Sequence, residues 1–341
     1  MNQKAGKPNM IKLINQSIIR KIFMSRRTLA CAEISVETGI SITTVRAVMN
    51  EMLNKGELIS VGLGESSGGR KSEQFIFNDD CYYGISVCIA DYSVFASIVN
   101  IHSEIVETQT IPVKKKKDSA NLLVNLLEDR INEKIKAIGI GVPGIVAMNG
   151  FVKKANGELT DNVDILTPLK QRFSLPIILE NDLRASALGF SKEIKNEFKN
   201  PTVAFINFES GCKGISAGFV EGQKIIRGIG NYSGELGLMP YDDKRDFCEA
   251  LYNTKSENER SKIIAKLLSW ICCAINPHQI MLCSNSEFKI NDNSIKKYLA
   301  HHLPDKMLPV LFTGHDFKQY FIKGMAKLTS DAIFRGNDNE E

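Results

Sequence analysis

Residues 28–56 read TLACAEISVETGISITTVRAVMNEMLNKG, and they carry the clearest local signals for how the N-terminal part of the chain folds. Gly39 stands where the end of a helix needs a left-handed backbone, so it ends a predicted helix over residues 28–38. Ser41 is a typical N-cap, so a second helix begins directly after it. Apolar residues then recur at helical spacing and define one buried face, at Val45, Val48, Met49, Met52 and Leu53.

A further helix is predicted before this pair, over residues 10–23, where Ile11, Ile14, Ile18 and Ile22 fall near helical spacing. Two helices joined by a short turn form a helix-turn-helix, whose second helix enters the major groove of DNA. When the apolar face of that second helix turns inward, its other face carries side chains that can contact base edges or the thymine methyl group. These are Ile42, Thr43, Thr44, Arg46 and Asn50.

Two short strands are predicted between residues 57 and 77, around a loop rich in Gly and Ser. The tip of this loop carries Gly69, Arg70 and Lys71, whose two cations suit phosphates or the minor groove. Residues 1–77 contain 11 Lys and Arg against 6 Asp and Glu, a net charge of +5, whereas the whole chain carries +4. This concentration of charge predicts a winged helix-turn-helix that binds a double-stranded DNA operator. The alternative is a three-helix bundle with a solvated basic loop, which the agreement of turn, caps, loop and charge disfavours.

The overall composition is that of an ordinary globular protein, with 43% hydrophobic and 24% charged residues among 341. No uninterrupted apolar stretch reaches ~18 residues, so neither a membrane span nor a membrane partner is expected. The first 22 residues have no continuous apolar segment of a secretory signal, and the eight cysteines form no CxxC pair. We therefore expect a cytoplasmic protein with buried, reduced thiols.

After residue 80 the pattern changes to strands followed by alternating strands and helices, in two successive halves. Such a pattern predicts an α/β body of two lobes with a cleft between them. The predicted division places the winged helix-turn-helix in residues 1–77, the first lobe in residues 81–190 and the second lobe in residues 191–341.

Five short motifs follow one another along this body. They are Gly139-Ile-Gly-Val-Pro-Gly144, Glu180-Asn-Asp182, Gly214-Ile-Ser-Ala-Gly218, Gly222 with Arg227-Gly228, and Ser233-Gly-Glu-Leu-Gly237. This order resembles the ROK family of sugar kinases and sugar-responsive repressors, and the resemblance extends from about residue 10 to residue 333. It implies an actin-like, hexokinase-like body. The repressor branch of the family, with its xylose-operon and N-acetylglucosamine-operon repressors, carries an N-terminal winged helix.

The sequence motifs with which ROK kinases bind nucleotide are largely lost in this chain. The kinase loop Asp-x-Gly-Gly-Thr falls on residues 86–90, which contain no acid, glycine or threonine. The second loop, Gly-Thr-Gly-Ile-Gly, falls on residues 212–216 and keeps one glycine of three. The Gly-Gly that borders adenosine falls on Cys283 and Ser284. Because glycines let backbone N–H groups approach a phosphate, these losses predict a protein that is not an enzyme and has no cofactor.

The resemblance implies that the residues that contact sugar in the family are better preserved here than the elements that bind nucleotide. Asn181 and Asp182 match family residues that hydrogen-bond sugar hydroxyls, and Glu235 matches the Glu of the family's Glu-x-Gly-His motif. Gly144, in the tight turn of the first motif, and Glu249, after the position of the family's zinc loop, complete the predicted ligand site. From its position after a strand, Asp182 is also interpretable as a helix N-cap, and the two roles are compatible.

Three departures bear on this site. Leu238 stands where the family has His, which removes a sugar contact and a zinc ligand. Only Cys248 remains of the zinc loop Cys-x-Cys-Gly-x-x-Gly-Cys, and one thiolate cannot form a tetrahedral site, so no metal is expected. Arg184 follows Asp182 by two residues, and it points either to solvent or towards an anionic ligand such as a sugar phosphate or sugar acid.

Together these observations predict a DNA-binding transcriptional regulator, a repressor of a carbohydrate-utilisation operon. A sugar or sugar phosphate between the lobes would set its affinity for the operator. A homodimer would place two recognition helices in successive major grooves of a palindromic site. One alternative is a ROK-type regulator without a sugar ligand, controlled by a protein partner. Another is a ROK sugar kinase with an accessory head, which the missing glycines disfavour.

Overall fold

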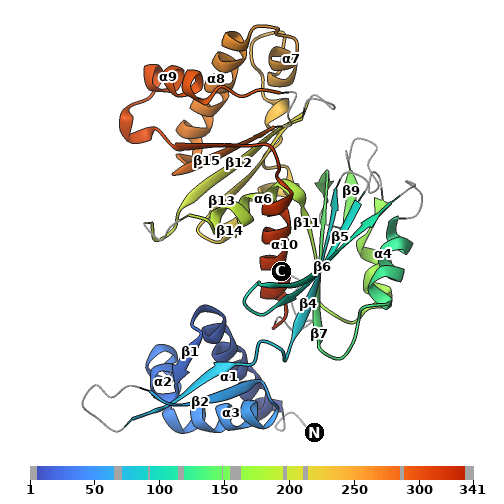
Figure 1. The fold of residues 1–341 in the computed structure, drawn as a ribbon, viewed down its shortest axis with the longest axis vertical. Helices are drawn as coiled ribbons and strands as arrows, with labels where there is room; N and C mark the ends of the chain where they lie inside the picture. Colours follow the sequence, from blue (N-terminus) through green and yellow to red (C-terminus); the bar gives the residue numbers. More distant parts are fainter. Residues whose placement is uncertain are drawn as a thin grey trace.

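The computed structural model describes residues 6–64, 71–90, 93–113, 119–147, 149–153, 163–194, 198–209, 214–284 and 288–334. Figure 1 shows three parts: an N-terminal unit, a first half built on one five-stranded sheet, and a second half built on another. Both large sheets combine parallel and antiparallel strands, so the chain has an α/β fold with mixed sheets.

The N-terminal unit consists of three helices and a three-stranded antiparallel sheet. Its elements are α1 (Gly6–Ser25), β1 (Thr28–Ala30), α2 (Cys31–Thr38), α3 (Ile42–Asn54), β2 (Leu58–Leu63) and β3 (Glu73–Phe77). The strand order is β1-β3-β2. Helices and sheet share one core, which includes Ile19, Phe23, Leu29, Ile34, Met49 and Met52.

The turn between α2 and α3 has the local geometry that its sequence predicts. Gly39 has φ of 70°, and its N–H donates to the Ser35 carbonyl at 3.0 Å. Ser41 caps α3, because its hydroxyl accepts from the Thr44 N–H at 3.3 Å. The predicted buried face of α3 is confirmed at Val45, Val48, Met49 and Met52, whereas Leu53 is half-buried.

Two features of the first helices differ from the prediction. The helix expected over residues 28–38 begins only at Cys31, because residues 28–30 pair with β3 as a strand and bury Leu29 and Ala30. Of the four isoleucines expected on one face of α1, only Ile22 lies in the core, where Ile19 and Phe23 join it. Apolar side chains therefore remain at the surface along α1, and we call them the α1 stripe: Met10, Ile11, Leu13, Ile14 and Ile18.

The first half contains a sheet of order β11-β7-β4-β5-β6. Its strands are β4 (Tyr83–Ala90), β5 (Ser93–Asn100), β6 (Ile105–Pro112), β7 (Ile135–Val142) and β11 (Ile177–Asn181). Helices α4 (Ser119–Glu128) and α5 (Leu166–Arg172) contribute Leu123, Leu127 and Leu169 to its core. A small antiparallel sheet adds β8 (Ile145–Val146), β9 (Phe151–Lys153) and β10 (Val163–Asp164).

The second half repeats this topology, with a sheet of order β16-β15-β12-β13-β14. Its strands are β12 (Thr202–Glu209), β13 (Gly214–Glu221), β14 (Lys224–Ile225), β15 (Gln279–Ser284) and β16 (Val310–Gly314). Each large sheet thus has three antiparallel strands followed by two parallel ones. The helical elements are α7 (Phe247–Tyr252), α8 (Glu257–Ile275), α9 (Asp292–His302), and the short 3-10 turns η1 (Ile229–Asn231), η2 (Leu236–Leu238) and η3 (Asp305–Met307).

Two helices join the halves, α6 (Asp182–Ser191) and α10 (Lys318–Ala332) (Figure 1). Their backbones touch, because a Cβ added to Gly324 would lie 1.8 Å from the Ala185 carbonyl oxygen. A Cβ added to Gly189 would lie 2.0 Å from the carbonyl oxygen of Tyr320. Helix α10 also packs on β4 and β7 of the first half, whereas α6 packs on β12 and β13 of the second. The two sheets are therefore held through one tightly packed helix pair.

The N-terminal unit docks on the first half and the end of α10. Phe334 packs edge-on against both Phe77 and Tyr82, with ring centroids 5.5 and 6.0 Å apart. Glu57, almost fully buried, accepts hydrogen bonds from the Arg20 guanidinium at 2.7 and 2.8 Å and from the Tyr82 hydroxyl at 3.1 Å. Burial and the nearby Glu57 carboxylate raise the pKa of Tyr82. An aromatic cluster and a satisfied buried carboxylate thus fix this junction.

Candidate functional site

The outer face of α3 is exposed. Thr43, Arg46 and Asn50 lie at the surface, and Ile42 is 38% exposed. Thr44 is only half-buried, and its hydroxyl hydrogen-bonds that of Ser41 at 2.8 Å, next to the cap of the helix. The residues predicted to contact DNA on this helix therefore occupy its solvent side, apart from Thr44, which also supports the cap.

The predicted wing is only partly described. Lys71 is exposed just before β3, and β2 and β3 form an antiparallel pair with an irregularity between Ser60 and Gly62. Gly69 and Arg70 lie outside the described residues.

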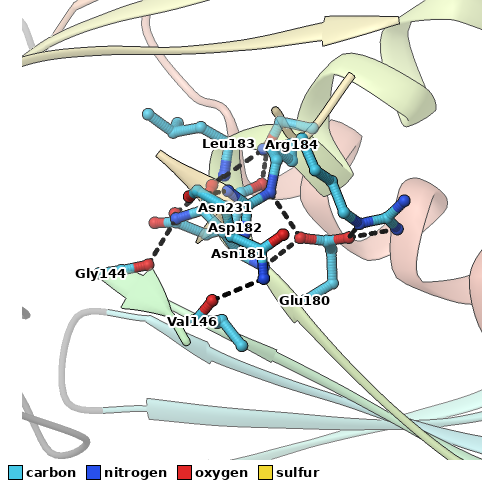
Figure 2. Close-up of polar contacts among 10 residues, drawn as sticks. Gly144, Val146, Glu180, Asn181, Asp182, Leu183, Arg184 and Asn231 are labelled. Carbon is cyan, nitrogen blue, oxygen red and sulfur yellow. Dashed lines mark hydrogen bonds and ion pairs between the residues drawn. The ribbon is translucent and has the colours of Figure 1, made fainter. Parts of the chain in front are cut away.

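In the body, Gly144, Asn181 and Asp182 lie together where β11 ends and α6 begins (Figure 2). Asn181 is the N-cap of α6: its Oδ1 accepts from the N–H groups of Leu183 and Arg184, each at 3.0 Å. Its Nδ2 donates to the Gly144 carbonyl at 2.9 Å and to Asp182 Oδ1 at 2.8 Å. The interpretation of Asp182 as the N-cap was therefore wrong by one residue, because Asn181 takes that role.

Asp182 is nearly buried at the first position of α6. Its Oδ1 accepts from the Leu183 N–H at 2.8 Å. Burial and, next, the Glu209 carboxylate raise the pKa of Asp182 to about 8, although the Leu183 N–H and Arg184 act in the opposite direction. Burial and repulsion by Glu209 both disfavour the charged carboxylate. The carboxyl is therefore mostly neutral at pH 7 and can either donate a proton to a bound hydroxyl or lose it.

A network of two arginines around Glu180 links the two halves beside this pair (Figure 2). The buried Glu180 accepts from Arg184 Nε through Oε1 at 2.6 Å, and from Arg227 Nε and Nη2 through Oε2 at 2.9 and 2.6 Å. Arg184 also donates to the Asn231 carbonyl at 2.9 Å, and Asn231 donates to the Val146 carbonyl at 2.9 Å. Residues of the first half, Glu180 and Val146, are thus bonded to residues of the second.

This network settles the position of Arg184. Its side chain is buried and paired with Glu180, so the predicted orientation towards solvent is wrong, whereas contact with an anionic ligand stays a prediction. Arg227 and Asn231 are partners of the site that the sequence did not predict. The available signal was the Arg227-Gly228 motif together with the acidic residue directly before Asn181.

Glu235 and Glu249 both lie in the second half, Glu235 directly before η2 and Glu249 within α7. Glu235, half-buried before η2, lies near the Cys248 thiol; burial raises the pKa of that thiol, with smaller contributions from Asp246 and Glu235. Glu249 is exposed and completes a capping box for α7. Its N–H donates to Asp246 Oδ1 at 2.8 Å, and its Oε2 accepts from the Asp246 N–H at 3.4 Å. A local structural role thus accounts for Glu249.

The position of the kinase phosphate loop is a strand here. Residues 86–90 form the end of β4 and are buried, and residues 283–284 end the buried strand β15. Across the described ranges, no group of three or more His, Cys, Asp and Glu is arranged to hold a metal ion. None of the described helices has the length and apolar character needed to cross a bilayer.

Known proteins resemble this chain in sequence and in fold. The model of the ROK family matches residues 91–253. A putative xylose repressor of Caldicellulosiruptor sp. (strain Rt8B.4) is 29% identical over 279 residues, covering 77% of this chain and 69% of that protein. The xylose repressor of Bacillus subtilis (strain 168) is 22% identical over 249 residues, covering 70% of this chain and 63% of that protein.

Two solved structures share the fold. One is a ROK family transcriptional regulator described as a homologue of the Escherichia coli MLC protein, with a TM-score of 0.71 at 16% identity over 96% of this chain and 97% of that one. The other is the ROK hexokinase from Thermus thermophilus, with a TM-score of 0.58 at 16% identity over 72% of this chain and 97% of that one. Residues 91–253 thus match the ROK family model, and the chain shares the fold of these two structures.

Proposed function

We propose that this protein is a DNA-binding transcriptional repressor of a carbohydrate-utilisation operon. The observation that carries the proposal is the N-terminal unit joined to the ROK domain. The regulator fold matches 96% of the chain, whereas the hexokinase fold matches 72%. The relatives named as xylose repressors support the same assignment. As a DNA-binding regulator without a membrane partner, the protein would act in the cytoplasm.

The N-terminal unit acts as a winged helix-turn-helix in this proposal. Helix α3 is the recognition helix, and Ile42, Thr43, Thr44, Arg46 and Asn50 face the bases. The exposed position of Arg46 and Asn50 supports this, because Arg and Asn can form paired hydrogen bonds with guanine and adenine in the major groove. The tip with Gly69, Arg70 and Lys71 contacts phosphates or the minor groove, and the local charge of +5 favours DNA.

The protein acts as a homodimer in this proposal. The α1 stripe supports it, because Met10 and Leu13 are 65 and 63% exposed and Ile11, Ile14 and Ile18 extend the same apolar surface. Exposed apolar surfaces of this kind are typical of association sites. Pairing of two α1 helices would set the spacing of two recognition helices on a palindromic operator.

A sugar or sugar derivative is the proposed effector, bound beside Gly144, Asn181 and Asp182 with Glu235 as a further contact. The family resemblance places Glu249 in the same site. Its support is the weakest of these residues, because its side chain already completes the capping box of α7. The Glu180–Arg227 pair bridges the halves next to Asp182, so a ligand that alters this bridge changes how the halves are placed. We propose no phosphoryl transfer, because the position of the first phosphate loop is a buried strand.

The proposal is tested by selecting operator sequences from a random DNA library with purified protein. The selected DNA is then titrated in the presence of a panel of sugars that begins with D-xylose. We expect a palindromic site and at least one sugar that shifts its apparent Kd by about 5- to 150-fold, as a coupling free energy of about 1–3 kcal/mol implies. Failure to select any sequence would contradict the repressor function. A selected sequence with no responding sugar would instead favour control by a protein partner.

A further inference from the structure

A cavity of about 720 Å³ lies where the N-terminal unit meets both halves of the body. Its walls come from α1, the turn after β5, the end of α6, the turn between β13 and β14, and α10. It is lined by Ser17, Lys21, Met24, Ser25, Ile101, His102, Ser103, Lys192, Gln223, Lys327, Asp331 and Phe334. None of these residues belongs to the Asn181–Asp182 site. Its size falls within the range of about 300–1,000 Å³ that is usual for small-molecule sites.

The cavity carries an excess of positive charge. Three lysines line it: Lys21 on α1 and Lys192 after α6, both of which are exposed, and Lys327 on α10. Lys327 pairs with Asp331 one turn further along α10. Among the described residues, neither Lys21 nor Lys192 has an ion pair or a side-chain hydrogen bond. A site with two unmatched ammonium groups favours an anion of two negative charges.

Lys327 lies near Lys192 and disfavours the charged form of its ammonium group. Packing around its ammonium group and the nearby Lys327 lower the pKa of Lys192 to about 8, against the opposing effect of Asp331, although the residue as a whole is exposed. On the facing elements, Lys21 adds a further cation, and His102 Nε2 lies 3.0 Å from Asp79 Oδ1. A bound anion would relieve this repulsion, and the free energy so released would favour binding.

The rest of the lining suits a phosphorylated metabolite. Hydroxyl and amide groups of Ser17, Ser103 and Gln223 can hydrogen-bond both a phosphate and sugar hydroxyls. Met24 and Phe334 offer apolar surface for the carbon skeleton. A phosphate monoester carries a charge of about −1.5 to −2 at pH 7, which matches the two unpaired ammonium groups. The volume also leaves room for the group that carries the phosphate.

We infer that this cavity is a second effector site, which binds the phosphate monoester of a small metabolite between Lys21, Lys192 and Lys327. A ligand here bridges α1 of the N-terminal unit to α6 and α10, the helix pair that joins the halves. Arg20, next to Lys21 on α1, is bonded to Glu57 in the core of the same unit. The ligand is therefore placed to fix the N-terminal unit relative to the body. Its effect on operator affinity rests on the proposed function, whereas its binding does not.

Binding is tested first without DNA, by calorimetry of the full chain with glucose 6-phosphate, inorganic phosphate and glucose. We expect glucose 6-phosphate to bind, inorganic phosphate to bind more weakly and glucose not to bind at this site. Lys192→Gln and Lys21→Gln should each weaken glucose 6-phosphate binding by about 10-fold or more, because a charge-assisted contact is lost. Lys192→Arg should retain much of the affinity. Lys296→Gln removes an exposed, paired lysine on α9 and serves as the matched control.

The outcomes separate the cavity from the sugar site. Asp182→Asn should leave glucose 6-phosphate binding unchanged, and a loss equal to that of Lys192→Gln would assign the ligand to the Asn181–Asp182 site instead. Absence of binding at millimolar concentration, or equal affinities in wild type and both Lys→Gln variants, would overturn the inference. Inorganic phosphate binding as tightly as the ester would also overturn it, because the cavity would then recognise the anion alone. With binding established, a change in operator affinity tests the coupling separately.

Discussion

Arg227 Nη2 lies 2.6 Å from Glu180 Oε2, and this pair connects the second half of the body to the end of β11 in the first. Its two members differ in environment, since the Glu180 side chain is 2% exposed and that of Arg227 is 44% exposed. The other oxygen of Glu180 is bonded to Arg184, whose side chain is only 4% exposed. One buried carboxylate thus holds both a buried and a surface guanidinium.

Replacing the Glu180 carboxylate by an amide should lower the free energy of unfolding substantially. Glu180→Gln leaves the buried Arg184 guanidinium without its counterion, and breaking a buried pair in this way lowers the free energy of unfolding by about 3–5 kcal/mol. Arg227→Gln should cost much less, about 0–1 kcal/mol, because that pair is partly screened by solvent. Urea denaturation followed by circular dichroism measures both. Glu193→Gln, at an exposed pair with Lys323, is the matched control. Equal denaturation midpoints for Glu180→Gln and this control would contradict the role of Glu180.

Asp182 should make the folded state less stable as the pH rises. Its folded pKa of about 8 lies above its ordinary value of 3.8, so the neutral carboxyl is favoured on folding. The stabilisation is complete below pH 3.8 and is lost progressively up to about pH 8. Asp182→Asn keeps an oxygen that can accept from the Leu183 N–H but carries no charge. The variant should therefore gain stability relative to wild type between pH 5 and 8, as measured by urea denaturation at several pH values. A constant difference over that range would contradict the raised pKa.

The local signals in the sequence predicted the N-terminal unit well because they act through neighbouring residues. Gly39 and Ser41 shape one turn, and α3 has a regular apolar face. The strand at residues 28–30 was missed because it forms only by pairing with β3, more than 40 residues away. The spacing of the isoleucines in α1 predicted a buried face that, apart from Ile22, is exposed. Helical spacing identifies an apolar face, but it does not say what covers that face.

In the body, sequence motifs located Gly144, Asn181 and Asp182, since short motifs mark the ends of strands. The sequence could not predict that Asn181 caps α6 while Asp182 is its buried first residue, because the two are adjacent and both residue types are good N-caps. The contact of Glu180 with Arg227 spans 47 residues and depends on the arrangement of the two halves. The cavity at the junction gathers side chains from five separate segments, which no single motif marks.

The α1 stripe predicts how the dimer can be broken. Leu13→Glu or Ile14→Glu places a charge in the proposed interface, where its burial against a second apolar helix would be strongly unfavourable. We expect sedimentation velocity to show a shift from dimer to monomer, with the fold preserved because neither residue contributes to the core. Val36→Glu is the matched control, because Val36 on α2 is 87% exposed and lies outside the stripe. A dimer that persists in both stripe variants would place the interface elsewhere.

Arg46 should carry part of the sequence specificity. Arg46→Ala should cost about 1–3 kcal/mol on the selected operator and relax the preference at one base position. Lys71→Ala should instead weaken specific and non-specific DNA alike and reduce the salt dependence of binding, as the loss of a phosphate contact does. Fluorescence anisotropy with the operator, with single-base variants and at several salt concentrations separates the two. Arg172→Ala, an exposed arginine of the body paired with Glu128, controls for charge alone. An unchanged base preference in Arg46→Ala would show that α3 does not read the operator through this side chain.

Asp182 also makes sugar binding depend on pH in a way that tests its proposed role. A sugar hydroxyl that donates to Asp182 favours the carboxylate, whereas the ligand-free carboxyl, facing Glu209 and Arg184, is mostly neutral below pH 8. Binding must therefore release a proton, and the affinity should rise by up to tenfold for each pH unit up to about 8 and then level off. Asp182→Asn has no proton to release at this position, so its affinity should be lower near pH 8 and nearly independent of pH. Calorimetry with the responding sugar, in buffers of different ionisation enthalpy, measures the affinity and the proton released together. A profile that falls towards pH 8 would mean that the neutral acid is the donor, and parallel profiles for wild type and Asp182→Asn would remove Asp182 from the sugar site.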